Sequence, residues 1–173
     1  MFMDTLTSGR IRLINCNEAV LTAILRGDDY LAKALSVTVP DQWSVFGIGV
    51  FEYILVKIGD IPSDLKWYSY LPIEKATNTL LGSCGYKGGP DETGVVEIGY
   101  EVAAAFRNQG YATEITELLI RHAFANPVVK SIQAHTLAEK NASVRVLEKC
   151  QFKFVEEIFD EEDGTIWKWN LKR

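Results

Sequence analysis

The residues whose types and spacing best suit chemistry lie in a turn at 107–112, with the sequence RNQGYA. Before it, residues 95–102 alternate apolar and polar side chains, which is the period of a β-strand. After it, residues 112–123 repeat apolar side chains at the spacing of a helix. Gly110 has no side chain and Ala112 has a small one, so a ligand can approach the first amides of that helix. Because these amides lack intrahelical partners and lie at the positive end of the helix dipole, the turn predicts a pyrophosphate site.

Two carboxylates lie on one face of the predicted strand. Glu97 and Glu101 flank Gly99 at the two-residue period that puts side chains on the same side. The missing side chain of Gly99 leaves a gap in which a ligand could lie. The alternative is that this face is only hydrated or bound by salt bridges.

The glycine turn alone does not identify a ligand, since many strand-to-helix turns bind nothing. A dinucleotide-binding fold requires three glycines spaced G-x-G-x-x-G, and a nucleotide-hydrolysing loop requires Gly-Lys-Ser/Thr. The turn has neither pattern.

Several segments resemble one family. Arg107-x-x-Gly110-x-Ala112, after a strand and opening a helix, resembles the acyl-CoA motif of the GNAT superfamily of N-acetyltransferases, Gln/Arg-x-x-Gly-x-Gly/Ala. Residues 141–152 are similar to a later family segment, and residues 10–13 and 167–169 extend the likeness over most of the chain. The likeness is closest to the branch that includes ribosomal-protein N-terminal acetyltransferases.

The resemblance implies a cosubstrate, acetyl-CoA, which enters a splay between the strands at 95–102 and 131–137 and gives its acetyl group directly to a primary amine. The amine belongs to a small molecule or to a protein N-terminus. Catalytic roles are implied for Glu97 and Ser143. Cofactor-binding roles are implied for Val102, Ala104, Arg107, Asn108, Gln109, Gly110, Tyr111, Ala112, Thr113 and Asn141.

A base is useful for this reaction. An α-amine is about 10% neutral at pH 7, whereas a lysine amine is neutral in only a few parts per ten thousand, a deficit of about 4.6 kcal/mol. Glu97, acting through a water, resembles the strand carboxylate proposed as base in several family members, and Glu101 is the second choice.

The chain departs from the family pattern at the general acid. The family's usual tyrosine falls on Leu147. The departing thiolate is only about 2 kcal/mol from protonated at pH 7, so a dedicated acid is dispensable. Ser143 is the nearest replacement, although starting a helix is an alternative role. The family's Asn falls on Lys140 by strict counting, with Asn141 one residue late, and its Gly before Phe152 is Gln151.

Other candidates have structural alternatives. We expect His122 and His135 to be structural rather than catalytic. Trp43, Trp67 and Tyr68 could line an acceptor pocket, but large aromatic side chains usually belong to the core. A non-catalytic acyl-CoA-binding or protein-interaction domain of the same fold is the alternative to an enzyme, motivated by the missing tyrosine.

Length and composition bound these interpretations. A chain of 173 residues suits one domain over 1–173. A net charge of −5 disfavours nucleic acid and mildly favours a cationic substrate. The 3 widely spaced cysteines predict reduced thiols in a cytoplasm and no metal site. No signal peptide or membrane-spanning segment is predicted, and we expect a monomer or a homodimer.

The periodicity along the chain predicts one α/β sheet of mixed direction. We expect strands at 10–14, 67–71, 79–86, 95–102, 131–137, 152–159 and 166–171. Helices are expected after a cap at Asn15 or Asn17, at 30–35, at 46–58, from Gly110 to Ala125, and near 144–150. Together with the resemblance, this gives a mostly antiparallel twisted sheet flanked by helices, with a splay between two central strands.

Overall fold

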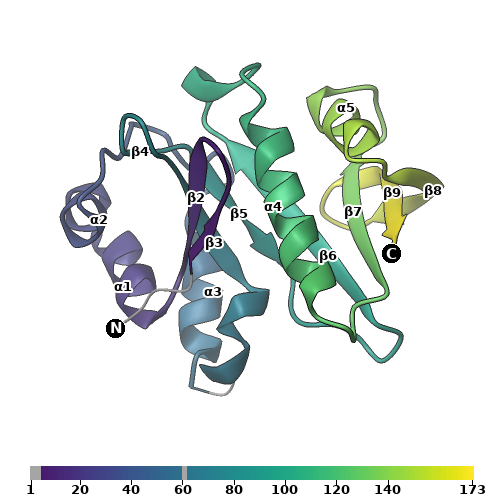
Figure 1. The fold of residues 1–173 in the computed structure, drawn as a ribbon, viewed down its shortest axis with the longest axis horizontal. Coiled ribbons are helices and arrows are strands. Elements are labelled where there is room, and N and C mark those ends of the chain that lie inside the picture. Colours follow the sequence, from purple (N-terminus) through teal and green to yellow (C-terminus); the bar gives the residue numbers. More distant parts are fainter. Residues whose placement is uncertain (1–4, 60–61) are drawn as a thin grey trace.

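The computed structural model describes residues 5–59 and 62–173, which form a nine-stranded sheet with helices on both faces (Figure 1). The path through the sheet is β1-β2-β3-β5-β6-β7-β9-β8, and β4 pairs with β3. All pairs are antiparallel except β6 with β7. The strands are β1 (Thr5–Thr7), β2 (Ile11–Asn15), β3 (Ser69–Glu74), β4 (Thr79–Leu80), β5 (Gly82–Tyr86), β6 (Val95–Val102), β7 (Ser131–Leu137), β8 (Lys153–Asp160) and β9 (Gly164–Lys172).

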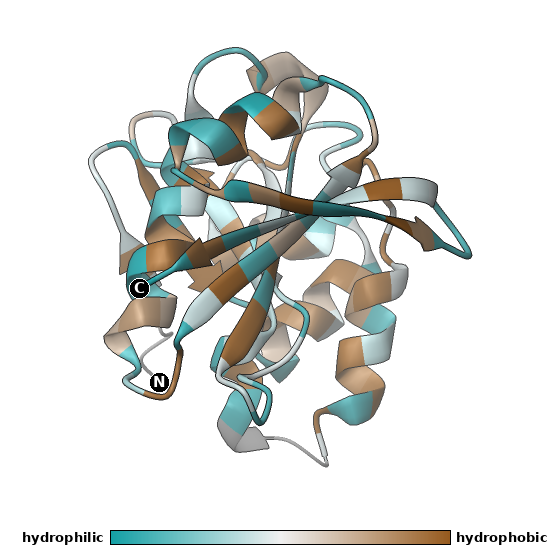
Figure 2. Ribbon diagram, turned by 90° about the vertical axis from the view of Figure 1, so that its right-hand side faces the viewer, coloured by the Kyte–Doolittle hydropathy of each residue, from teal (hydrophilic) through white to brown (hydrophobic). Residues whose placement is uncertain are grey.

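Two hydrophobic clusters cover the two faces of the sheet. Leu13 belongs to the cluster that includes the long helix α4 (Tyr111–Ala125), whereas the next residue, Ile14, belongs to the cluster of α1 (Glu18–Arg26), α2 (Asp28–Leu35) and α3 (Gly49–Lys57). Neighbouring residues of a strand point to opposite faces, so a strand buried on both sides loses the polar alternation of an exposed sheet. Figure 2 shows brown and teal bands alternating along the helices, as expected of elements with one buried face.

The predicted splay is present between β6 and β7. The parallel ladder joins only Val95–Glu97 of β6 to residues 131–133 of β7. Beyond it, β6 continues to Val102 along β5, and β7 continues to Leu137 along β9. The two strands therefore diverge toward their carboxyl ends, where α4 follows β6 and α5 (Ala142–Lys149) follows β7 (Figure 1).

Most predicted elements are confirmed, although β1 was not predicted and several bounds differ. Asn17 caps α1, since its side chain accepts a hydrogen bond from the Val20 amide. The strand predicted from Trp67 begins at Ser69, because Trp67 ends a 3-10 helix (Pro62–Trp67). The strand predicted over 79–86 is divided into β4 and β5, and Phe46 precedes α3 instead of lying in it.

Among the described residues, no helix has both the length and the apolar character needed to cross a membrane.

Candidate functional site

A pocket of about 370 Å³ lies at the start of α4, at the open end of the splay. Seven of the residues expected to bind the cofactor line it: Val102, Arg107, Asn108, Gly110, Tyr111, Ala112 and Thr113. The first turn of α4 forms one wall, and α5 contributes Ala142, Arg145, Val146 and Lys149. The turn between β6 and α4 therefore faces the helix that follows β7.

The amides at the start of α4 are open to this pocket. Gly110 has φ 83°, a left-handed conformation that favours glycine, and α4 has no side-chain cap. The first helical hydrogen bond runs from the Glu114 amide to the Gly110 carbonyl, at 3.1 Å. Within the described chain, the amides of residues 111–113 have no hydrogen-bond acceptor. An anion in the pocket can accept hydrogen bonds from them at the positive end of the helix dipole.

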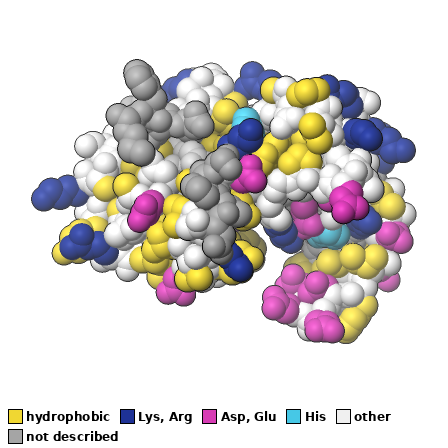
Figure 3. All heavy atoms as spheres, turned by 90° about the horizontal axis from the view of Figure 1, so that it is seen from below, with side chains coloured by type: hydrophobic (Ala, Val, Ile, Leu, Met, Phe, Trp, Pro, Cys, Tyr) yellow, Lys and Arg dark blue, Asp and Glu magenta, His cyan; other side chains and the backbone are white. Residues whose placement is uncertain are grey.

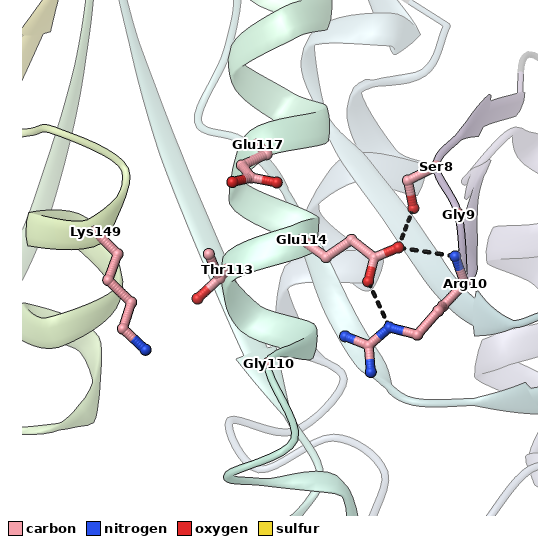
Figure 4. Close-up of a pocket in the computed structure, with 8 residues that line it drawn as sticks. All are labelled: Ser8, Gly9, Arg10, Gly110, Thr113, Glu114, Glu117 and Lys149. Carbon is pink, nitrogen blue, oxygen red and sulfur yellow. Dashed lines mark hydrogen bonds and ion pairs between the residues drawn. The ribbon is translucent and has the colours of Figure 1, made fainter.

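Positive side chains surround this turn. Arg145 and Lys149 are one helical turn apart on α5 and line the pocket, and Figure 4 shows Lys149 extending toward the start of α4. Arg107 Nε donates to the Val102 carbonyl at 3.0 Å, which folds this side chain back onto β6. The charge balance at the turn favours a multiply charged anion.

Arg10 approaches the same turn from the other side, along a second cavity of about 430 Å³ (Figure 4). Its Nη1 donates to the Gln109 carbonyl at 3.1 Å, and its Nε pairs with Glu114 at 2.8 Å. Its guanidinium lies 4.5 Å from the ring centroid of Tyr111. Arg10 thus braces the turn through backbone, ionic and ring contacts.

Three residues expected to bind the cofactor do not line the pocket. Ala104 lies in a 3-10 helix, and the Gln109 side chain donates to the Ala105 carbonyl at 3.2 Å. Asn141 caps α5, accepting a hydrogen bond from the Val144 amide at 3.0 Å. A cofactor-binding role for these three residues stays a prediction.

The opposite face of β6 carries Glu97 in a network of hydrogen bonds. Its Oε1 is bound by Lys87 Nζ and by His135 Nδ1, the latter at 3.0 Å, and its Oε2 accepts from Gln133 Nε2 at 2.9 Å. Burial of the side chain raises the pKa of Glu97, but the hydrogen bonds from Lys87, Gln133 and His135 outweigh it, so the pKa lies below the usual range. The carboxylate is ionised at neutral pH and already has several partners.

This network predicts a pH dependence of stability. Because the folded state lowers the pKa of Glu97, its contribution to the free energy of unfolding is present above about pH 4.3 and is lost as pH falls through the folded pKa. Glu97→Gln should therefore be less stable than the wild type at neutral pH. We expect the difference to shrink as pH falls below about 4.3. Urea unfolding of both proteins across this range measures it, and a constant difference would contradict the network.

Glu101, the second candidate base, is buried and fully bound. It accepts hydrogen bonds from the Val45 amide at 2.8 Å, the Phe46 amide at 3.0 Å and the hydroxyls of Ser44 and Ser83 at 3.0 and 2.7 Å. These four donors fill the acceptor capacity of a carboxylate. Glu101 therefore holds the loop before α3 against the sheet.

The loop that Glu101 holds carries exposed apolar side chains on the Glu101 face of β6. Val45, Phe46 and Ile48 in the loop expose 52%, 84% and 41% of their surface. Figure 3 shows a hollow between the lobe of the N-terminal half and the lobe of the C-terminal strands. The face of β6 that carries Glu97, Gly99 and Glu101 is opposite the face that packs on α4.

Tyr100 extends across the splay on the α4 side. Its hydroxyl donates to the Ser143 carbonyl, at 3.4 Å, at the start of α5. Burial raises the pKa of Tyr100, against smaller opposing effects of hydrogen bonds with Ser143 and Thr116, so the hydroxyl stays protonated at neutral pH. Ser143, expected to be catalytic, thus lies beside a second proton-bearing side chain.

Comparison with known proteins agrees with the family resemblance of the sequence. The family model described as Acetyltransferase (GNAT) domain matches residues 52–153. The chain is 30% identical to the uncharacterized N-acetyltransferase YjdG of Bacillus subtilis (strain 168) over 154 residues, covering 87% of this chain and 90% of YjdG. The chain belongs to the GNAT acetyltransferase family.

Solved GNAT structures share the fold over nearly the whole chain. RimL, a ribosomal L7/L12 alpha-N-protein acetyltransferase in complex with coenzyme A, has a TM-score of 0.71 at 15% identity, with 98% of each chain covered. The ribosomal-protein-S5-alanine acetyltransferase of Vibrio fischeri has a TM-score of 0.69 at 11% identity, covering 97% of this chain and 96% of that one. The resemblance to the branch with ribosomal-protein acetyltransferases is thereby confirmed at the level of fold.

Two of the three aromatic candidates for the acceptor pocket belong to the core. Trp43 is buried and donates to Asp28 at 2.9 Å, and Trp67 is buried against Tyr86 and His122. Tyr68 packs against the cluster of α1–α3. The prediction that these rings are more often core is confirmed for Trp43 and Trp67.

Sequence reasoning missed several residues that line the pocket or contact the candidate residues of the site. The sequence could have indicated Arg145 and Lys149, since their four-residue spacing puts both on one face of a helix. It could not indicate the contacts of Lys87 and Tyr100, because their partners Glu97 and Ser143 come from other elements.

Proposed function

We propose that this protein is an N-acetyltransferase that moves the acetyl group of acetyl-CoA to a primary amine, carried by a small molecule or a protein N-terminus, by direct transfer. The proposal takes residues 1–173 as one domain acting in the cytoplasm with no metal. The observation that carries it is the pocket beside the uncapped start of α4, at the open end of the splay. The CoA complex of the related fold supports acetyl-CoA as the cosubstrate.

The site suits each part of acetyl-CoA in turn. The pyrophosphate accepts hydrogen bonds from the amides at the start of α4, with Arg145 and Lys149 beside it. The pantetheine arm follows the edge of β6 that the ladder with β7 leaves free after Glu97. The thioester then lies between the Tyr100 side of the splay and the Glu97 side. Holding both reactants in this geometry supplies much of the rate enhancement expected of direct transfer.

The acceptor amine approaches from the hollow on the face of Glu97. This ionised carboxylate attracts an ammonium group, and the proton of the ammonium leaves toward the network around it. A backbone amide of β6 polarises the thioester carbonyl. The departing sulfur is next to the start of α5, where Ser143 and the protonated Tyr100 lie.

A non-catalytic acyl-CoA-binding domain is the second candidate, favoured by one observation. Leu147 occupies the position of the family's usual tyrosine acid and is 1% exposed, so it has no proton to give. Such a domain keeps the pyrophosphate turn and lacks turnover.

Two measurements separate these functions. Thermal unfolding with CoA should show a stabilisation of about 2.7 kcal/mol at a concentration one hundred times the dissociation constant. Incubation with acetyl-CoA and a panel of acceptors, comprising a serine-initiated peptide, an alanine-initiated peptide and spermidine, should release free thiol with at least one amine. CoA binding without thiol release from any acceptor would favour the second candidate, and no CoA binding would exclude both.

A further inference from the structure

His135 forms a pair with Glu97 at the closed end of the splay. Its Nδ1 lies 3.0 Å from Glu97 Oε1, and the two side chains are 18% and 17% exposed. The ladder between β6 and β7 ends at Glu97 and Gln133, two residues before His135. The imidazole thus lies on the face of Glu97 at the point where the strands begin to diverge.

The second ring nitrogen of His135 is open to solvent. Within residues 5–59 and 62–173, the hydrogen bonds of this ring involve Nδ1 only. No side-chain nitrogen or oxygen atom in these residues is both buried and without a hydrogen-bond partner. Nε2, which has no partner there, is therefore accessible. When a carboxylate accepts a hydrogen bond from Nδ1–H of a neutral imidazole, the proton is on Nδ1 and Nε2 is the nitrogen that can accept another proton.

Glu97 is itself poorly placed to take a proton. Three donors occupy its two oxygens, which offer about four acceptor positions. Hydrogen bonds from Lys87, Gln133 and His135 outweigh the effect of burial and hold its pKa low, which makes the carboxylate a weak base. A low pKa keeps the negative charge in place, and that charge stabilises a neighbouring imidazolium.

The other charged groups around His135 come from β8, from β9 and from the residue that follows β5. Lys168 of β9 is opposite His135 in the ladder and pairs with Glu156 of β8 at 3.5 Å. Lys87 follows β5 and contacts Glu97. Asp160 ends β8, and its pKa is lowered first by backbone hydrogen bonds from Asp163 and Glu162 and then by the nearby Lys87 and His135. With Glu97 there are three carboxylates and two lysines around the ring.

We infer that His135 is the catalytic proton acceptor for the amine and that Glu97 is its positioning residue, an inference that rests on the proposed acetyl transfer. The ammonium of the acceptor gives one proton to His135 Nε2, directly or through a water. The neutral amine forms the C–N bond at the thioester carbonyl, and the C–S bond breaks. The second amine proton goes to the departing sulfur, which leaves as the free thiol, and His135 returns its proton to solvent.

The test uses His135→Asn, since the Asn amide can still donate to Glu97 from the position of Nδ1 while Nε2 is lost. We expect kcat to fall about a hundredfold with the best acceptor of the panel, with little change in CoA affinity. The acid-side decline of the wild-type pH profile of kcat should disappear. In a His135→Gly variant, free imidazole should restore part of the activity.

Glu97→Gln provides the second arm. Removing the negative charge makes the imidazolium harder to form, so the acid-side decline should move to lower pH and kcat should fall about tenfold. Wild-type kcat and an unchanged pH profile in His135→Asn would overturn the inference while leaving acetyl transfer intact. Absence of thiol release in the wild type would instead overturn the proposed function, and with it this one.

Discussion

Gly110→Val should weaken CoA binding about a thousandfold and leave the protein folded. Gly110 has φ 83°, where a β-branched residue is a genuine outlier, so valine forces the turn into another conformation. The amides at the start of α4 then point away from the pocket. Losing two charge-assisted hydrogen bonds to the pyrophosphate, at about 2 kcal/mol each, gives this factor. Calorimetric titration with CoA measures it.

Gly164→Val is the matched control. Gly164 has φ 74° at the tip of the hairpin between β8 and β9, and no atom lies within 4 Å of an added Cβ. Its substitution imposes similar backbone strain far from the pocket, so the loss of stability should resemble that of Gly110→Val while CoA affinity stays at the wild-type value. Equal CoA affinity in both variants would show that the turn does not hold the pyrophosphate.

The strand-turn-helix unit around Gly110 could be predicted because its signal is local. The change from a two-residue to a helical period brackets Gly110, and the strand ends and the helix begins on either side of that change. The splay was different, since only the family resemblance implied it. No pattern within β6 or β7 shows that their ladder stops after Glu97.

The contacts of the polar face of β6 could not be predicted from the sequence. Alternation placed Glu97 and Glu101 on one face, which is correct, but their partners lie far along the chain. His135 is 38 residues from Glu97, and the Val45 amide is 56 residues from Glu101. The pKa and the role of a carboxylate cannot be predicted when the donors that bind it are unknown. Only the fold distinguishes a charge that supports an imidazole from one that closes a loop.

Glu101→Ala should lower the free energy of unfolding by about 3–5 kcal/mol, because buried hydrogen-bond donors left without an acceptor cost about 1–3 kcal/mol each. Three donors are left without an acceptor, and two of them are the backbone amides that fix the loop at Val45 and Phe46, whereas the Ser44 hydroxyl can still donate to the Gly47 carbonyl. The loop carries the exposed side chains of Val45, Phe46 and Ile48 on the face of β6 that the proposal assigns to the acceptor, so KM for the amine should also rise while CoA affinity is unchanged. Urea unfolding and steady-state kinetics measure the two effects.

Ser83→Ala is the control for this network, since it removes one donor to Glu101 and leaves the other three. It should cost about 1 kcal/mol, and the acceptor KM should stay near the wild-type value because the loop amides keep their acceptor. The contrast isolates what Glu101 does for the loop. If Glu101→Ala were as stable as Ser83→Ala and bound the amine equally well, the loop would be held by its own packing, and the carboxylate would again be available as a candidate base.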